Sequence, residues 1–204
     1  MPEGVDATVV GGAVTPLVDC EQAAAGWLLQ PVNAVSSLAF VVAAIVLAAR
    51  TGQRWIPVAL AATGIGSFLF HGPVPPGSEW AHDVSLAWLL AVAGAAGTRW
   101  ERTVGWTTLV AFGITFAILP VIADPVAAVT AVVAIAAILW RDRSRRTLAA
   151  LALLGTGAVV GRLSATGALW CQPDSLLQGH AFWHLAAATA VTVWALGLPS
   201  ANRP

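Results

Sequence analysis

Two histidines, His180 and His184, stand four residues apart in the segment HAFWH, within a long apolar run. On a helix, residues at this spacing lie about 40° apart around the axis and about 6 Å apart along it, so both imidazoles can bind one metal ion. The HExxH helix of metalloproteases carries its own glutamate as general base, but here Ala181, Phe182 and Trp183 fill the intervening positions. A base for metal-assisted hydrolysis must therefore come from another part of the chain.

A second group of polar residues lies around one bend, in the stretch GIGSFLFHGPVPPGSEWAHDVS, residues 64–85. His71 supplies a third imidazole, and three histidines with one open position are typical of a catalytic zinc, which lowers the pKa of its bound water to about 7. Ser67 precedes His71 by one helical turn, so it shares its face and can orient that water or stabilise an oxyanion. Asp83 is our candidate for the general base.

The composition describes the elements that must position these residues. Of the 204 residues, 58% are hydrophobic and 10% are charged, whereas a soluble domain has about 25% charged residues. Apolar runs long enough to cross a bilayer recur along the chain, which predicts an all-α membrane protein with seven transmembrane helices in a single domain, residues 1–204. The expected spans are 33–49, 55–71, 81–98, 104–119, 122–140, 147–169 and 177–197.

The charge distribution predicts the orientation of the spans. All ten basic residues are arginines, and nine of them lie in the loops after the first, third and fifth spans or in the C-terminal tail. By the positive-inside rule, the N-terminus is outside and the C-terminus is cytoplasmic. Because the arginines lie where topology requires them, they do not indicate a nucleic-acid partner, and we expect none. The nine arginines are Arg50, Arg54, Arg99, Arg102, Arg141, Arg143, Arg145, Arg146 and Arg203, and the acidic residues of the opposite side are Glu3, Asp6, Asp19, Glu21, Glu79, Asp124 and Asp174.

This topology brings the polar residues to one depth, under the outer leaflet. The second span runs outward to His71, while the third and seventh spans begin outside with Asp83 and the HAFWH pair. An ionisable group within a membrane costs about 2.5–3.5 kcal/mol, which favours a functional site. Since neighbouring helical positions point about 100° apart, His82 and Asp83 cannot both face the metal well, and we expect His82 at the rim. Arg162, in the sixth span, either pairs with Asp174, contacts a substrate headgroup or snorkels outward.

Singly, each of these residues also has an ordinary structural explanation. A histidine pair can be structural, a serine such as Ser67 can bond the carbonyl four residues earlier, and an aspartate such as Asp83 can cap a helix. Their shared depth and side, with few polar groups elsewhere in the spans, favour a metal site over these separate explanations.

The chain resembles the alkaline ceramidases in an ordered set of motifs. These enzymes belong to a superfamily of seven-span membrane hydrolases that includes the adiponectin-type receptors and the Per1-like proteins. The resemblance covers about residues 19–190, and it implies a zinc ion held by three histidines with Ser67 and Asp83 beside it. The motifs are CE at 20–21, QPVNAVSS at 30–37, GIGSFLFH at 64–71, Asp83 and CQPDSLLQGHAFWH at 171–184, and the implied zinc ligands are His71, His180 and His184.

The same resemblance bears on the cysteines and on calcium. It implies a disulfide between Cys20 and Cys171, which both fall in outer loops where oxidation is permitted; two free cysteines are the alternative. Animal alkaline ceramidases also bind calcium through an acid- and amide-rich N-terminal stretch. Here Glu21 matches a ligand and Gln30 stands at an acidic position, but calcium needs about six to eight oxygens, and this segment offers too few.

Together these observations predict a zinc-dependent intramembrane amidohydrolase that cleaves the N-acyl amide of ceramide or a related membrane lipid. Asp83 would be the general base and Ser67 would stabilise the oxyanion. The alternatives are a receptor-like or structural membrane protein that keeps the metal without catalysis, and a haem protein with axial histidines. The lysine-free, arginine-rich composition indicates a bacterial genome and hence the cell membrane. Because many bacteria make no ceramide, another acylated amine or an ester also remains open as the substrate.

Overall fold

The computed structural model describes residues 19–198. Residues 1–18 and 199–204, which include Glu3, Asp6 and Arg203 of the orientation argument, lie outside the described residues. The described chain is all-helical, as predicted, apart from one isolated bridge between Asp19 and Ala165. The elements are α1 Pro31–Arg50, α2 Trp55–His71, α3 Ser78–Ala95, α4 Glu101–Ile118, the 3-10 turn η1 Pro120–Ile122, α5 Ala123–Arg141, α6 Arg145–Leu163 and α7 Gly179–Ala195.

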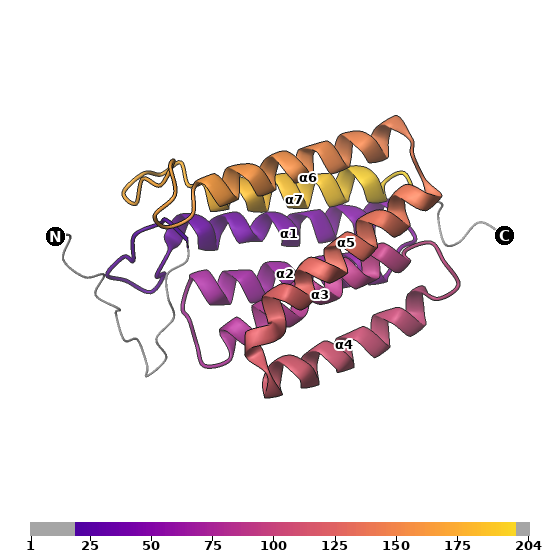
Figure 1. The fold of residues 1–204 in the computed structure, drawn as a ribbon, viewed down its shortest axis with the longest axis horizontal. Helices are drawn as coiled ribbons and strands as arrows, with labels where there is room; N and C mark the ends of the chain where they lie inside the picture. Colours follow the sequence, from indigo (N-terminus) through magenta and orange to yellow (C-terminus); the bar gives the residue numbers. More distant parts are fainter. Residues whose placement is uncertain (1–18, 199–204) are drawn as a thin grey trace.

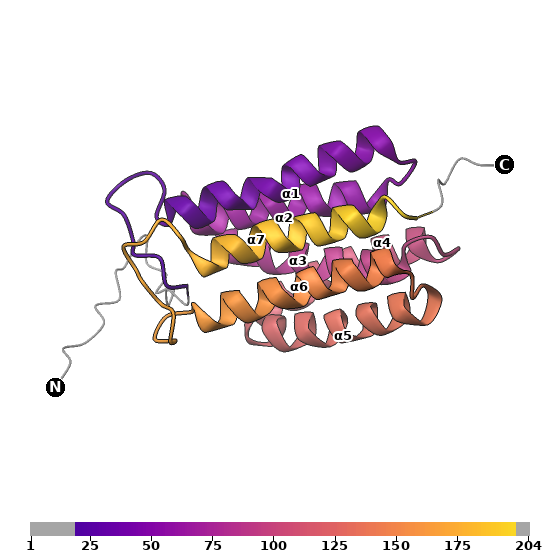
Figure 2. The same cartoon turned by 90° about the horizontal axis from the view of Figure 1, so that it is seen from above.

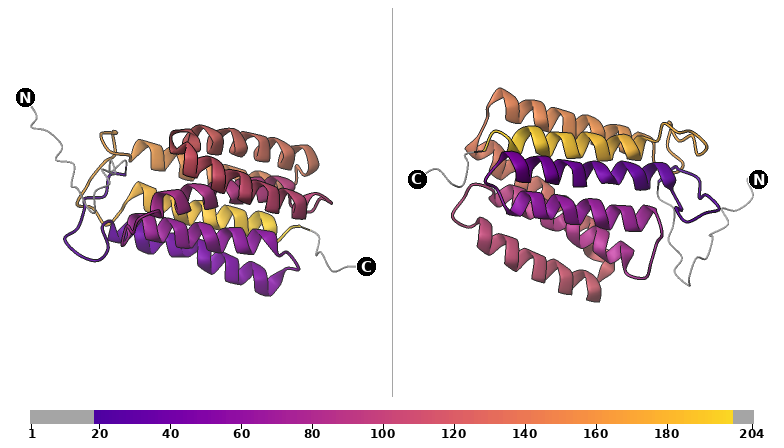
Figure 3. Two further views of the ribbon diagram at one scale, coloured as in Figure 1. Left: turned by 90° about the horizontal axis from the view of Figure 1, so that it is seen from below. Right: turned by 180° about the vertical axis from the view of Figure 1, so that it is seen from behind.

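The helices form an elongated bundle in which successive helices run in opposite directions (Figure 1). Helix α1 packs against α2 and α7, and α6 covers α7 (Figure 2). The view from behind in Figure 3 shows α6, α7, α1 and α2 in succession. Helix α3 contacts α2 and also α4 and α5, so it joins the two halves of the bundle.

The alternation of directions gives the bundle two ends of different character. The loops after α2, α4 and α6 lie at one end, which we call the histidine end because His71, His180 and His184 are found there. The loops after α1, α3 and α5 lie at the other, which we call the arginine end. Its arginines are Arg50, Arg54, Arg99, Arg102, Arg141, Arg143, Arg145 and Arg146.

The sixth helix is shorter than expected. The apolar pattern predicts a span to residue 169, but α6 ends at Leu163. The Ser164 N–H donates to the carbonyl of Val160, and Ala165 then leaves the helix to bridge Asp19. Gly167 adopts a left-handed φ of 77°, which completes the turn. Residues 164–169 therefore belong to the loop at the histidine end, and Arg162 is exposed in the last turn of α6.

Two glycines let α2 approach its neighbours closely. A Cβ on Gly64 would lie 2.8 Å from Val41 Cγ2 of α1, and a Cβ on Gly66 would lie 2.8 Å from the carbonyl oxygen of Ala81 in α3. Both distances are shorter than a carbon can tolerate, so the sequence needs glycine at these positions. The next turn of α2 ends at His71, whose carbonyl accepts the N–H of Gln30 just before α1.

Three helical segments are long and apolar enough to span a membrane: Pro31–Arg50, Pro120–Arg141 and Arg145–Leu163. Trp55–His71 is also apolar but shorter. The surface of the bundle exposes many large apolar side chains, as a lipid-facing surface does. A membrane location is therefore possible for this fold. Exposed examples are Val42 and Ile45 of α1, Ile114 of α4, Val132, Val133 and Trp140 of α5 and Val159 of α6.

Candidate metal centre

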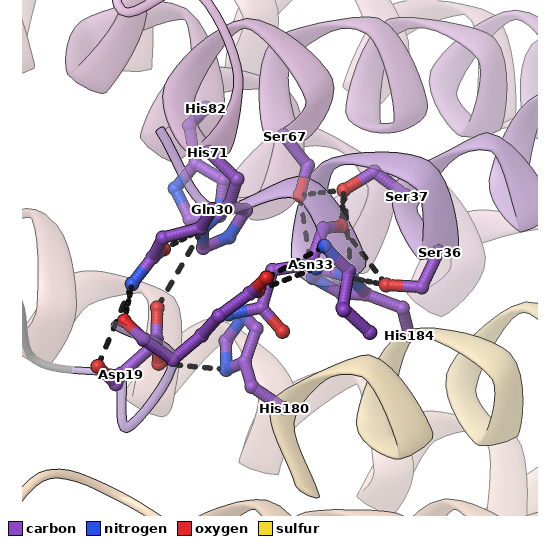
Figure 4. Close-up of polar contacts among 12 residues, drawn as sticks. Asp19, Gln30, Asn33, Ser36, Ser37, Ser67, His71, His82, His180 and His184 are labelled. Atoms are coloured by element: carbon purple, nitrogen blue, oxygen red, sulfur yellow. Dashed lines mark hydrogen bonds and ion pairs between the residues drawn. The ribbon is translucent and has the colours of Figure 1, made fainter. Parts of the chain in front are cut away.

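Three histidines meet at the histidine end of the bundle (Figure 4). His71 is the last residue of α2, while His180 and His184 lie on the first two turns of α7. The ring centroids are 4.9 Å apart for His71 and His180, 5.4 Å for His71 and His184, and 4.5 Å for the pair on α7. One ligand nitrogen from each ring lies within 4.8 Å of the other two. The predicted convergence of these three imidazoles is confirmed.

Each imidazole is oriented by an oxygen at its Nδ1 atom. Gln30 Oε1 lies 2.7 Å from His71 Nδ1, and Asp19 Oδ1 lies 2.9 Å from His180 Nδ1. An amide or carboxylate oxygen can only accept, so Nδ1 carries the hydrogen in both rings and Nε2 keeps its lone pair. The orientation of the Gln30 amide follows from its other end, where Nε2 donates to the Glu21 carbonyl at 3.1 Å.

His184 is held in a similar way by a hydroxyl group. Ser36 Oγ lies 2.9 Å from His184 Nδ1, and the same hydroxyl donates to the Asn33 carbonyl at 2.9 Å. Because the serine hydrogen points to that carbonyl, Nδ1–H of the imidazole donates to Ser36. All three rings therefore present Nε2 to the shared space, as metal-binding histidines with oriented Nδ1–H groups do.

The Nε2 atoms of these imidazoles are the groups that could bind a metal ion. His71 Nε2 and His180 Nε2 are buried and have no hydrogen-bond partner among residues 19–198. Leaving a buried polar atom unpaired costs about 1–3 kcal/mol, and coordination to a cation would satisfy both lone pairs. The donor set of three neutral imidazoles therefore fits a metal ion, and it leaves further coordination positions for water or substrate.

Ser67 lies where the sequence places it, beside the histidines. Its side chain is 1% exposed, and its Oγ is 3.3 Å from His184 Nε2 and 2.8 Å from Ser37 Oγ. The Ser37 hydroxyl donates to the Asn33 carbonyl at 2.8 Å, so the hydrogen between the two serines comes from Ser67. In this arrangement the only hydrogen of Ser67 is directed at Ser37.

Asp83 lies near the start of α3 and contacts its neighbour His82. Its Oδ1 accepts a hydrogen bond of 2.9 Å from His82 Nδ1, and the His82 ring stacks on Phe70 with centroids 4.9 Å apart. The same ring lies edge-on to His71 at 6.2 Å. In the described part of the chain, His82 is thus the residue that contacts both Asp83 and a metal-site histidine. Sequence reasoning assigned it only to the rim.

A disulfide joins Cys20 and Cys171, with Cα atoms 5.4 Å apart, as the resemblance implied. It ties the segment before α1 to the loop before α7, and the Gln22 N–H donates to the Pro173 carbonyl beside it. This tie brings Asp19 to His180 and within 3.7 Å of His71 Nδ1. Sequence reasoning missed the role of Asp19 because nothing in its local sequence marks it as a partner of α7.

The Glu21 carboxylate accepts backbone hydrogen bonds at the start of α1. Its Oε1 accepts the N–H of Val32 at 2.7 Å, and its Oε2 accepts the N–H of Asn33 at 2.8 Å. Such a carboxylate satisfies helical donors that have no partner within the helix and interacts favourably with the helix dipole. Both oxygens of the residue that matches a calcium ligand in the resemblance thus have a structural task in this chain.

The stretch QPVNAVSS carries a polar stripe that we did not assign from the sequence. Gln30, Asn33, Ser36 and Ser37 recur at helical spacing, on the face that α1 turns to α2 and α7. Polar residues with a period of three to four in an otherwise apolar span are a signal that could have identified them. Gln30 and Ser36 contact imidazole Nδ1 atoms, while the Asn33 carbonyl accepts from Ser36 and Ser37.

Comparisons of this chain with protein-family models, with curated proteins and with solved structures find no match. No relative therefore assigns a substrate or a reaction to the histidine end. The side chains that meet there are the evidence for its chemistry.

Proposed function

We propose that this protein is a zinc-dependent intramembrane amidohydrolase that cleaves the N-acyl amide of ceramide or a related membrane lipid. The observation that carries the proposal is the convergence of three imidazoles. Their Nδ1–H groups are occupied, while two Nε2 atoms have no partner among residues 19–198. Three neutral imidazoles with room for a further ligand favour zinc. When bound, zinc would supply Lewis acidity toward the acyl carbonyl and toward water.

The side chains around the histidines would handle protons and charge. Asp83 is the proposed base, which later returns its proton to the leaving amine, and the hydrogen bond from His82 fixes one of its carboxylate oxygens. Ser67 lies beside His184 Nε2, where its hydrogen bond to Ser37 holds it. Asp19, Gln30 and Ser36 keep the imidazoles in the tautomer that binds metal.

We further propose that all seven helices span the cell membrane of a bacterium, with the N-terminus outside and the C-terminus in the cytoplasm. This arrangement is supported by three long apolar segments and by the apolar side chains exposed on the surface of the bundle. It is also supported by the arginines, which lie at the end opposite the histidines. The histidine end then lies under the outer leaflet. A lipid substrate would enter it laterally from that leaflet.

The first test is the metal content and activity of the full-length protein purified in detergent without chelator. We expect close to one zinc per chain in the wild type, hydrolysis of a fluorescent N-acyl lipid, and loss of both in a His180→Ala, His184→Ala double variant. Wild-type protein that lacks zinc contradicts the metal assignment, and a haem absorption band would favour the haem alternative. Zinc without turnover of N-acyl lipids or esters would favour the non-catalytic alternative.

A further inference from the structure

Asn33 is the most unusual polar residue near the histidines. Its side chain is fully buried, with 0% exposed, and neither Nδ2 nor Oδ1 has a hydrogen-bond partner among the described residues. The other buried side-chain atoms in this condition are His71 Nε2 and His180 Nε2. A buried amide without partners is costly, so it demands an explanation as much as the free imidazole nitrogens do.

The position of Asn33 on α1 directs its amide to the metal centre. Gln30 lies one turn before it and contacts His71, while Ser36 and Ser37 lie one turn after it and contact His184. Residues three and four apart share one face of a helix, so the amide in the turn between them faces the same space. Figure 4 shows Asn33 among these residues.

The backbone of Asn33 is held on both sides. Its N–H donates to Glu21 Oε2, and its carbonyl accepts the hydroxyl hydrogens of Ser36 and Ser37. These three contacts fix the Cα of Asn33 relative to the imidazoles. The amide is thus a preorganised group with two unused N–H donors and one unused acceptor.

Most hydrogen-bond donors of the site are already paired, which leaves the Asn33 amide to bind a ligand. The hydrogen of Ser67 points to Ser37, and the hydrogen of Ser37 points to the Asn33 carbonyl. The Nδ1–H groups of His71 and His180 are also occupied, by Gln30 and Asp19. The Asn33 Nδ2 hydrogens are therefore the donors in this cluster that remain for a bound molecule.

We propose that Asn33 binds the acyl group of the substrate, an inference that rests on the proposed hydrolase function. Its Nδ2–H donates to the acyl carbonyl oxygen, where negative charge develops as the amide is attacked. Its Oδ1 accepts a hydrogen bond from a polar hydrogen of the same molecule. Removal of one such donor lowers kcat by about 10²–10³-fold in other hydrolases.

The test compares zinc-loaded, full-length wild-type protein with Asn33→Leu, which keeps the approximate volume and removes the amide. Asn33→Ala is the substitute if the leucine variant does not fold. We expect kcat for a fluorescent N-acyl lipid to fall about 10²-fold. The matched control is Thr147→Val, which alters a buried polar residue at the arginine end and should change kcat by less than about threefold.

Two further measurements separate this role from others. The cobalt-substituted variant should keep the visible spectrum of the wild type; an altered spectrum would make Asn33 Oδ1 a metal ligand and overturn the proposal. Palmitate, an acyl product, should bind zinc-loaded Asn33→Leu about tenfold more weakly than wild type. Equal palmitate affinities, or a kcat within threefold of wild type, overturn the inference. A wild type that binds zinc but hydrolyses nothing contradicts the proposed function instead, and palmitate binding then still decides the role of Asn33.

Discussion

The histidine end and the arginine end satisfy their polar groups in different ways. At the histidine end, Ser36 bonds His184 across 148 positions of sequence, and Ser67 lies beside the same ring across 117 positions. At the arginine end, Asp142 accepts from Thr147 only 5 positions away, and Arg143 donates to a carbonyl 4 positions away. Arg141 does reach Gly94 and Ala96 at the C-terminal end of α3, but it too donates only to backbone carbonyls.

This difference distinguishes hydrogen bonds that any helical bundle requires from those that a functional site requires. Local hydrogen bonds at the arginine end finish helices, and they would serve any apolar bundle equally well. Long-range hydrogen bonds between buried side chains at the histidine end form only when several helices pack in one arrangement. They leave imidazole and amide atoms without a partner among the described residues. Such a cluster is costly in apolar surroundings unless a ligand or reaction uses it.

The largest effect that tests this contrast is expected for Asp83. Asp83→Asn removes the proposed base while it keeps the size of the side chain, so we expect turnover of N-acyl lipid to fall by at least about 10²-fold. Zinc content should stay at the wild-type level, because the metal-site residues are His71, His180 and His184, and Asp83 is not among them. Steady-state kinetics and metal analysis check both.

The control is Glu79→Gln, which removes an exposed carboxylate from the first turn of the same helix, α3. It should behave as wild type. Turnover preserved in Asp83→Asn would remove Asp83 from the reaction and point to another base, with His82 as the neighbour to examine.

A smaller effect is expected for Asp19, which precedes the disulfide residue Cys20 and orients His180. Asp19→Ala should weaken zinc affinity or activity by about 10–100-fold, the usual result of losing such a partner. Zinc affinity is measured by competition with a chelator of known affinity. Asp174→Asn, at an exposed carboxylate in the loop that the disulfide joins, is the matched control. Equal affinities in the two variants would show that the carboxylate of Asp19 does not support the metal.

Packing at the histidine half of α2 gives a test on stability. In Gly66→Ala, the new Cβ would lie 2.8 Å from the Ala81 carbonyl oxygen and 2.9 Å from Ser85 Oγ, so we expect a loss of about 1–3 kcal/mol. In Gly155→Ala, on α6, no atom lies within 4 Å of the new Cβ, and the change should be neutral or slightly stabilising. Thermal unfolding in detergent measures both. Equal Tm values would mean that α2 and α3 have room to separate.

The smallest effect concerns the arginine end and depends on pH. Hydrogen bonds from the Thr147 hydroxyl and the Ser144 N–H lower the pKa of Asp142. Since the pKa of the unfolded state, about 3.9, is the higher value, the stabilisation is present above it and is lost as the pH falls through the folded-state pKa. Wild type should therefore have a higher Tm than Asp142→Asn at pH 7, with the difference disappearing in acid. A difference independent of pH would contradict this.

Much of the histidine end could be predicted because its signals are local. The i, i+4 spacing places His180 and His184 on one helical face in any structure, and the arginine distribution puts His71 at the same end of the bundle. Other partners carried no such signal. Asp19 reaches His180 from a segment that the disulfide and the bridge to Ala165 hold in place. The contact of His82 with His71 depends on how α3 packs against α2, which no local pattern specifies.

The sequence by itself determined that the chain forms seven apolar helices with arginines and histidines at opposite ends, because hydrophobic periodicity and charge placement act along each helix separately. It also determined most helix ends to within a few residues. Only the tertiary structure decided that α6 stops at Leu163 and that Gln30, Ser36 and Asp19 orient three imidazoles. It also decided that the Asn33 amide has no partner in the described part of the chain. The physical reason is that these contacts join segments far apart in the chain, so they exist only once the helices have packed.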